Sequence, residues 1–274
     1  MVKPTRSWLF TPGTRPDRFA KAAEAGADVL IIDLEDAVAQ GQKAEARASV
    51  LSYFAHKPSE SIARAIRING LDTVHGLADL HAVIEDAVDA DFLILPKTES
   101  ADHILILDRL LSRVGIRSQL VGLIESARGL TAVDKIAAAS PRLHGLMLGA
   151  ADMAADLGAG VSWDNLSYIR GRFVVACANA RIAAIDSPWF DVRDEAGLIQ
   201  EVRRAVGMGF VAKAAIHPGQ VKAINTALTP TAEEVQLARA ILVENEKGVG
   251  VINGKMIDEA IARKARRVLA AAGG

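Results

Sequence analysis

Two carboxylates stand out in this sequence because each follows an apolar run. Glu125 comes after VGLI (121–124), and Asp152 comes after LMLGAA (146–151). Runs of this kind, bounded by glycine and polar residues, are typical of buried strands in a parallel sheet. Neighbouring parallel strands lie about 4.8 Å apart, so two acids at the same end of adjacent strands could reach one small ion. Oxygen ligands of this kind suit Mg²⁺.

The alternative is that each acid caps the helix that follows it. A capping carboxylate needs no metal, because it accepts hydrogen bonds from free N–H groups of the first helical turn. The two acids alone leave both interpretations open, and the surrounding elements have to decide between them.

The elements that would position these acids form a pattern that recurs eight times. Each unit is a short apolar run, a polar or Gly/Pro stop and an amphipathic segment, with a spacing of about 30 residues, the size of a βαβ unit. The apolar runs lie at 6–13, 27–36, 62–69, 90–97, 118–126, 142–152, 181–189 and 209–218. Eight such units in 274 residues predict an α/β fold of the (β/α)₈ TIM-barrel class. No GxGxxG follows the first run, which disfavours a dinucleotide-binding open sheet.

Helical spacing of apolar residues predicts helices over 43–56 and 101–114, the second ending at Gly115 as a C-cap. Thr231 and Glu234 predict a capping box that opens a helix over 231–247. A glycine-rich hinge and one more helix follow at 248–272. We therefore expect a catalytic barrel over 1–228 and a helical extension over 229–274, placed as a lid or arm on the neighbouring subunit.

Composition limits the class of protein. Half of the residues are hydrophobic, the formal net charge is −1, and the single cysteine, Cys177, allows no intrachain disulfide or cysteine-based zinc site. This charge balance argues against nucleic-acid binding through phosphate contacts. The N-terminus lacks the apolar stretch of a signal peptide, and no window approaches the roughly 18 apolar residues of a membrane span. We expect a cytoplasmic globular protein with no nucleic-acid or membrane partner.

Catalytic side chains of a β/α barrel lie at the C-terminal ends of its strands. Charged residues follow the predicted strands, whereas ordinary loops would have Ser, Asn and Gly there as often. The polar residues at these strand ends are Asp33, Glu35, Asp36, Arg67, Asn69, Lys97, Glu99, Glu125, Asp152, Asp186 and His217. Carboxylates and cations facing one cavity indicate an anionic substrate held by a metal and an arginine.

Arg67 is the candidate for binding the anion. A guanidinium can hold a carboxylate through two parallel hydrogen bonds, which lysine cannot do. The alternative is a structural ion pair with Asp33 or Glu35, and the spacing alone does not decide between the two roles.

Three other rim positions also have two interpretations. The small residues before Asp152, including Ala151, could present backbone amides to a carboxylate or could simply form a tight turn. Lys97 could form a Schiff base if it were desolvated, but an ion pair with a nearby acid is favoured. We interpret His217 as a residue that orients its loop.

A series of motifs runs in order across nearly the whole chain. These motifs are RSWLFTPGTRPDRFAKA (6–22), IIDLEDAV (31–38), IRING (66–70), LPKTES (95–100), GLIESARG (122–129), LGAADMAADLG (148–158), AAIDSPWFDVRDEAGL (183–198), KAAIHPGQV (213–221) and GKMIDEA (254–260). Together they resemble the citrate lyase beta-subunit-like family of the HpcH/HpaI aldolase superfamily, which includes malyl-CoA and citramalyl-CoA lyases.

The resemblance implies a homotrimer or homohexamer of barrels, each with a C-terminal helical element. It implies Mg²⁺, or Mn²⁺ in its place, held by Glu125 and Asp152. Arg67, with Ala151 beside the metal ligands, would bind the carboxylate of a 2-oxo acid. Asp258, in the GKMID motif, would be carried on the lid into the active site of the adjacent subunit.

The resemblance also implies roles for residues around this centre. The residues that would contact the coenzyme A moiety of a thioester substrate are Phe10, Arg15 and Arg18. The residues that would surround the metal site and orient its waters are Asp33, Glu35, Asp36 and Lys97.

The expected reaction is Mg²⁺-dependent cleavage of citramalyl-CoA or malyl-CoA to acetyl-CoA and a 2-oxo acid, pyruvate or glyoxylate. The first alternative is the beta subunit of a citrate lyase complex, acting with other lyase subunits on a citryl thioester of an acyl-carrier protein. The others are a malyl-CoA thioesterase and a non-catalytic subunit that binds CoA or a carrier protein. A methyl pocket discriminates by only about 1–3 kcal/mol, so no single residue decides the preferred acid.

Overall fold

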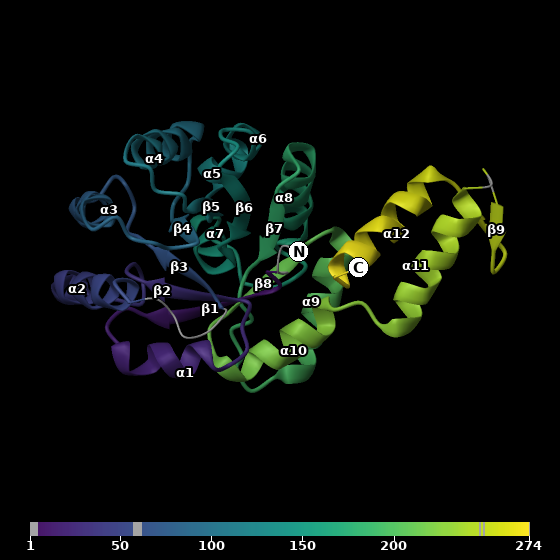
Figure 1. Cartoon of the computed structure of the whole chain (residues 1–274), viewed down its shortest axis with the longest axis horizontal. Coiled ribbons are helices and arrows are strands. Elements are labelled where there is room, and N and C mark those ends of the chain that lie inside the picture. The colour runs from purple at the N-terminus through teal and green to yellow at the C-terminus, as the bar shows by residue number, and fades with distance from the viewer. Residues whose placement is uncertain (1–4, 57–61, 247, 249, 274) are drawn as a thin grey trace. The chain divides into compact units, whose positions relative to one another are not determined.

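Eight parallel strands form a closed barrel, in which each strand pairs with its neighbours in sequence and β1 also pairs with β8 (Figure 1). The computed structural model describes residues 5–56, 62–246, 248 and 250–273. The strands are β1 (Ser7–Pro12), β2 (Val29–Asp33), β3 (Ala63–Arg67), β4 (Phe92–Leu95), β5 (Gln119–Ile124), β6 (Leu143–Leu148), β7 (Ala183–Asp186) and β8 (Ala212–Ala215). Each lies within one of the eight apolar runs, and the TIM-barrel prediction is confirmed.

The barrel interior is a layered apolar core. Alternate residues of each strand face it, such as Val29 and Ile31 of β2 and Val121 and Leu123 of β5. The same period of two continues to Asp33 at the end of β2, and to Arg67 after Ala65 and Glu125 after Leu123. The charged groups at these strand ends therefore form the layer above the apolar core.

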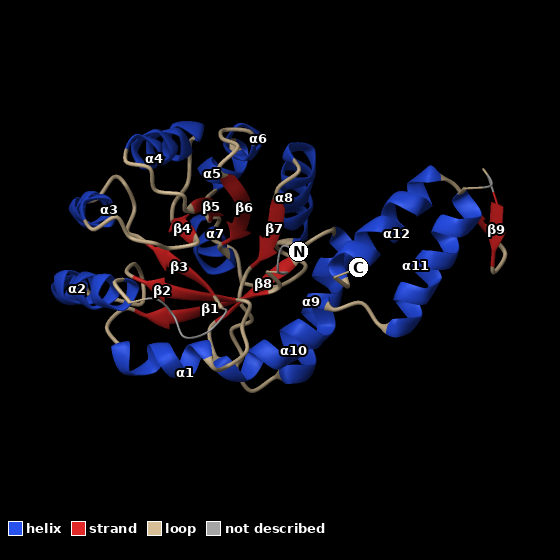
Figure 2. Ribbon diagram, in the orientation of Figure 1, coloured by secondary structure: helices blue, strands red, loops and turns tan. Residues whose placement is uncertain are grey.

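Helices follow the strands around the outside of the barrel (Figure 2). They are η1 (Pro16–Arg18), α1 (Phe19–Ala23), η2 (Gln40–Gln42), α2 (Lys43–Phe54), α3 (Val74–Glu85), α4 (Ala101–Arg113), α5 (Ala127–Thr131), α6 (Val133–Ala137), α7 (Ala150–Asp156), α8 (Ser167–Ala180), α9 (Glu195–Met208) and α10 (Pro218–Leu228). Gly115 follows α4 with φ of +76°, as the C-cap prediction requires. Cys177 is buried on α8, and burial raises the pKa of its thiol to about 12.

The chain divides into the barrel unit, Thr5–Ile224, and a C-terminal unit that begins at Asn225, so the division falls within α10. The C-terminal unit contains α11 (Ala232–Asn245) and α12 (Glu259–Ala271). The predicted capping box of Thr231 and Glu234 opens α11. Small buried residues, including Ala238 and Ala262, allow the two helices to pack closely.

A β-hairpin stands where the sequence predicted only a glycine-rich hinge. Its strands are β9 (Gly250–Ile252) and β10 (Lys255–Ile257). The two turn residues, Asn253 and Gly254, have φ of +49° and +73°. Asn-Gly favours this two-residue turn because both residues tolerate positive φ, and that signal was present in the sequence. Val249, at the start of the predicted hinge, lies outside the described residues.

No helix in the part of the chain that the structure describes is both long enough and apolar enough to cross a lipid bilayer.

Candidate active site

The ends of β2 and β3 bring Asp33 and Arg67 together, because the strand register pairs these two residues. Arg67 Nε and Nη2 donate to the two carboxylate oxygens of Asp33 at 2.7 and 2.6 Å, and Nη1 lies 3.1 Å from Glu35 Oε2. Burial lowers the pKa of Arg67, but the carboxylates of Asp33 and Glu35 outweigh this effect and raise it overall. The ion-pair interpretation of Arg67 is therefore confirmed.

Phe10 lies below this ion pair on β1. Its ring centroid is 4.8 Å from the Arg67 guanidinium carbon, within the range of a cation–π contact. The ring therefore helps to hold the guanidinium, a role that sequence alone did not suggest. Arg15, also expected near coenzyme A, pairs with Asp17 at 2.7 Å on the surface, and Arg18 ends the exposed η1 turn.

Glu125 directly follows β5 and is buried. Its Oε1 accepts a hydrogen bond from the backbone N–H of Lys97 at 2.7 Å. Burial, followed by the carboxylates of Glu35 and Asp152, raises the pKa of Glu125 to about 8, although the Lys97 N–H and Arg67 act in the opposite direction. The raised pKa means that Arg67 and the Lys97 N–H do not offset the cost of burying the Glu125 charge.

Asp152 lies in the first turn of α7, close enough for its charge to raise the pKa of Glu125. Neither acid is an N-cap, because α5 is capped by Ser126 and the N-cap position of α7 is Gly149. The capping interpretation is therefore wrong for both acids. Ala151, next to Asp152, is exposed in the same turn.

Lys97 links Glu125, which its backbone N–H contacts, to Glu35 and Asp36, which its ammonium group contacts. Its Nζ donates to Glu35 Oε1 at 2.6 Å and lies 4.0 Å from Asp36 Oδ1. The ion-pair interpretation of Lys97 is confirmed, and its ammonium is not desolvated as a Schiff-base lysine would be.

The donor set and the charge of this site fit a hard divalent cation. Four carboxylates, those of Asp33, Glu35, Glu125 and Asp152, face two cations, Arg67 and Lys97, which leaves an excess of two negative charges when all are ionised. Among the described residues no three His, Cys, Asp or Glu side chains form a metal-binding cluster. Mg²⁺ needs only one or two carboxylates, because it usually keeps several waters.

Sequence reasoning missed Lys43, and it named Asn69 as a rim residue without its partners; both hold the loop after β2. Lys43 is buried, and its Nζ donates to the carbonyl oxygens of Leu34 and Glu35 at 2.8 and 2.7 Å. Asn69 Nδ2 donates to the Leu34 carbonyl at 3.0 Å and to Asp79 Oδ2 at 2.6 Å. These contacts fix the backbone that carries Asp33 and Glu35, and only the tertiary structure reveals them.

Two rim predictions have different outcomes. Asp186 does not face the rim cavity, since Ile185 takes the inward position and Asp186 points outward, where it is buried against Lys213 Nζ at 2.7 Å and Arg170 Nε at 3.1 Å. The lysine within the apolar run 209–218 was the available signal for this network. His217 is exposed and its Nδ1 accepts the N–H of Gly219 at 3.1 Å, so the loop-orienting interpretation is confirmed.

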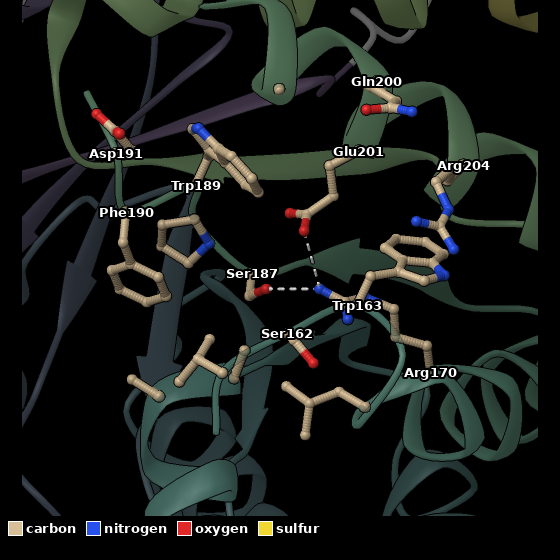
Figure 3. Close-up of a pocket in the computed structure, with 16 residues that line it drawn as sticks. Ser162, Trp163, Arg170, Ser187, Trp189, Phe190, Asp191, Gln200, Glu201 and Arg204 are labelled. Atoms are coloured by element: carbon tan, nitrogen blue, oxygen red, sulfur yellow. Dashed lines mark hydrogen bonds and ion pairs between the residues drawn. The ribbon is translucent and has the colours of Figure 1, made fainter. Parts of the chain in front are cut away.

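A cavity of about 560 Å³ reaches the first turn of α7, where Ala151 directly precedes Asp152. Figure 3 shows its aromatic walls, which include Trp163 and Trp189. The guanidinium of Arg170 lies at its edge beside Ser187 and Glu201 (Figure 3). Since neither Glu125 nor Asp152 lines this cavity, it adjoins α7 without including the carboxylate pair.

Asp258 lies in the C-terminal unit, where it is the N-cap of α12. Its Oδ1 accepts a hydrogen bond from the backbone N–H of Ile261 at 3.0 Å. This local contact gives Asp258 a structural role within its own unit, and its expected role in an adjacent subunit remains a prediction.

The fold and the cluster define a (β/α)₈-barrel enzyme whose charged groups meet at the C-terminal ends of the strands. Residues 6–218 match the family model described as HpcH/HpaI aldolase/citrate lyase, and the chain belongs to this family. It is a carbon–carbon lyase.

Relatives and solved structures agree with this assignment. The chain is 35% identical to an L-malyl-CoA/beta-methylmalyl-CoA lyase of Cereibacter sphaeroides over 98% of this chain and 94% of that protein. It is 34% identical to a citrate lyase subunit beta-like protein of Mycobacterium tuberculosis over 97% of this chain and 95% of the relative.

Two crystal structures are also similar. RipC from Yersinia pestis is 53% identical, with a TM-score of 0.75 over 84% of this chain and 98% of that chain. The protein CitE from Mycobacterium tuberculosis, in complex with magnesium, acetoacetate and coenzyme A, is 32% identical with a TM-score of 0.85 over the full length of both chains.

Proposed function

We propose that this protein cleaves a 3-hydroxyacyl-CoA thioester whose hydroxyl carbon carries a carboxylate, to acetyl-CoA and a 2-oxo acid. The observation that carries the proposal is the pair Glu125 and Asp152 beside Arg67, in a cluster with more carboxylates than cations. The preferred substrates are citramalyl-CoA, which gives pyruvate, and malyl-CoA, which gives glyoxylate. The malyl-CoA lyase relative and the magnesium and coenzyme A of the similar CitE structure support this choice.

Glu125 and Asp152 would hold Mg²⁺, or Mn²⁺ in its place. An ion held there would lower the pKa of the substrate hydroxyl and would stabilise the carbonyl that forms from it. Two N–H groups of Arg67 donate to Asp33 and Nη1 is ion-paired with Glu35, so the guanidinium, which has five N–H groups, keeps donors for the substrate carboxylate. Backbone amides at Ala151–Asp152, in the first turn of the helix after β6, would bind the same carboxylate at the same end of the barrel.

The bond that breaks joins the hydroxyl carbon to the carbon next to the thioester carbonyl. Its electron pair moves to the thioester fragment as an enolate, and the hydroxyl proton is lost as the oxo group forms. The enolate then takes a proton and becomes acetyl-CoA. Asp258, carried on residues 229–274 of an adjacent subunit in a homotrimer or homohexamer, is the proposed acid/base group for these proton transfers.

The thioester would approach along the β1 side of the rim. Phe10, Arg15 and Arg18 are the proposed contacts to the coenzyme A moiety, and the two surface arginines would face its phosphates. Asp36 and Lys97, together with Asp33 and Glu35, would orient the waters that complete the metal shell.

A second candidate is the beta subunit of a citrate lyase complex, which the citrate lyase beta-like relative favours. It would act on a citryl thioester held by an acyl-carrier protein and release oxaloacetate. The site chemistry is the same in both candidates, and only the substrate distinguishes them.

Incubation with malyl-CoA, citramalyl-CoA and citryl-CoA, with Mg²⁺ or with a chelator, tests the proposal. We expect acetyl-CoA and a 2-oxo acid from one of the first two substrates, and none with the chelator. Free thiol without a 2-oxo acid would indicate a thioesterase, and turnover of citryl-CoA alone would favour the citrate lyase subunit. Binding without any product would indicate a non-catalytic subunit and would overturn the proposal.

A further inference from the structure

The backbone at Lys97 and at Gly149 lies against the side chain of Glu125. The barrel register pairs Ile124 with Leu148, so Glu125 and Gly149 are the next residues along two adjacent strands. Lys97, two residues beyond β4, reaches the same carboxylate from the other neighbouring strand. Glu125 is therefore enclosed between the loops that follow β4 and β6.

Lys97 has a left-handed backbone conformation, with φ of +48°. The other described non-glycine residues with positive φ follow helices α3 and α8 or lie in the β9–β10 turn, where this conformation is ordinary. At Lys97 it follows a strand and carries a steric cost, because the Cβ crowds the next carbonyl. In this conformation the backbone N–H donates to Glu125 Oε1 at 2.7 Å.

Gly149 has an ordinary backbone conformation, with φ of −95° and ψ of 85°, so φ does not demand glycine. A Cβ added there would lie 2.5 Å from Glu125 Cβ and 2.7 Å from Glu125 Oε2. Both distances are far shorter than van der Waals contact. Any side chain at this position would therefore displace the Glu125 carboxylate.

We infer that Lys97, through its backbone N–H, and Gly149, through its missing side chain, are positioning residues that set the direction of the Glu125 carboxylate. Oε1 is engaged by Lys97, and within the described chain no donor contacts Oε2. Oε2 is then the oxygen presented to the proposed ion. This inference deepens the proposed function and rests on it for the identity of that ion.

The Gly149→Ala variant tests the close approach, with Gly207→Ala as its matched control. Gly207 is exposed on α9, and a Cβ there would meet nothing within 4 Å. Mutation of a group that orients a metal ligand typically lowers metal affinity about 10–100-fold. We expect calorimetry to show Mg²⁺ binding about 10–100-fold weaker in Gly149→Ala and unchanged in Gly207→Ala. Equal affinity in both variants would overturn the role of Gly149.

Lys97→Gly and Lys97→Val separate the backbone of Lys97 from its ammonium group. Both remove the ammonium, but glycine adopts positive φ freely, whereas β-branched valine strongly resists it. We expect Mg²⁺ binding at least tenfold weaker in Lys97→Val than in Lys97→Gly. Equal losses in the two variants would mean that the ammonium matters and the backbone does not. Circular dichroism and thermal unfolding confirm that each variant is folded.

A crystal structure of metal-free Gly149→Ala distinguishes failure of this inference from failure of the proposed function. The inference requires a rotated Glu125 carboxylate and loss of its hydrogen bond from Lys97, whether or not the wild-type protein binds Mg²⁺. If wild-type protein binds no Mg²⁺ but the carboxylate still rotates, the metal assignment fails and the positioning role stands. An unmoved carboxylate would overturn the positioning role itself.

Discussion

Arg67 and Asp33 meet through two parallel hydrogen bonds, Nε to Oδ1 at 2.7 Å and Nη2 to Oδ2 at 2.6 Å, at the paired ends of β3 and β2. This fork fixes the plane of the guanidinium. A lysine has no such plane and cannot reproduce this geometry.

Replacing Arg67 with lysine should therefore weaken catalysis although the charge is kept. A hydrogen bond to a charged group is worth about 1.5–3 kcal/mol, so kcat/KM should fall roughly 10–150-fold. Steady-state kinetics with the preferred thioester measure this loss. The change Arg15→Lys, at an exposed arginine paired with Asp17, keeps the charge and should leave the free energy of unfolding unchanged. Wild-type kcat/KM in Arg67→Lys would show that Arg67 does not bind substrate.

Removing either proposed metal ligand should abolish Mg²⁺-dependent cleavage. Glu125→Gln and Asp152→Asn each keep the shape of the side chain and remove its charge, so Mg²⁺ binding measured by calorimetry should be lost in both. Asp102→Asn is the matched control, because Asp102 is exposed in the first turn of α4 at the same end of the barrel. Retention of chelator-sensitive turnover in Glu125→Gln would refute the metal assignment.

Asp258 can be tested without destroying its capping role. Asparagine caps helices as well as aspartate does, so Asp258→Asn should preserve α12 while removing the acid. General acid–base catalysis contributes about 10²–10⁴-fold, and kcat should fall by that factor with little change in thermal stability. Unchanged turnover would end the lid assignment.

Mixed oligomers test whether Asp258 acts in a neighbouring subunit. Co-expression of Asp258→Asn with Glu125→Gln subunits should restore about a quarter of wild-type activity, because random assembly leaves that share of sites with both native residues. Each variant expressed alone should retain at most about 1% of wild-type activity. Failure of the mixture to recover activity would place Asp258 in the site of its own chain or outside any site.

Asp186 should make the stability of the barrel depend on pH. Burial alone would raise its pKa, but the ion pairs with Lys213 and Arg170 outweigh burial and lower it. Its contribution is therefore present in full above the unfolded pKa of about 3.9 and is lost as pH falls through the lower folded value. Urea unfolding should show this loss as the pH falls below about 4, and Asp186→Asn should remove this part of the pH dependence. At pH 7 the variant should be about 3–5 kcal/mol less stable, because it leaves buried cations without their partner.

The sequence by itself determined the barrel and the polar ends of its strands. Apolar runs, polar stops and amphipathic segments are local patterns. Their eightfold recurrence predicts eight parallel strands whose C-terminal ends all lie at one end of the barrel. Because catalytic groups of this fold lie at that end, Glu125, Asp152 and Arg67 could be proposed from the chain alone. The Asn253–Gly254 turn is equally local, since an Asn-Gly pair by itself favours the two-residue hairpin turn seen between β9 and β10.

Only the tertiary structure decided which groups meet. Closure of the barrel sets the register that places Asp33 against Arg67 and Gly149 against Glu125. The turn that aims the Lys97 N–H at Glu125 has no sequence signal, since lysine is not a residue that favours positive φ. These contacts join residues far apart in the chain, so their geometry depends on the packing of neighbouring strands and not on any local pattern.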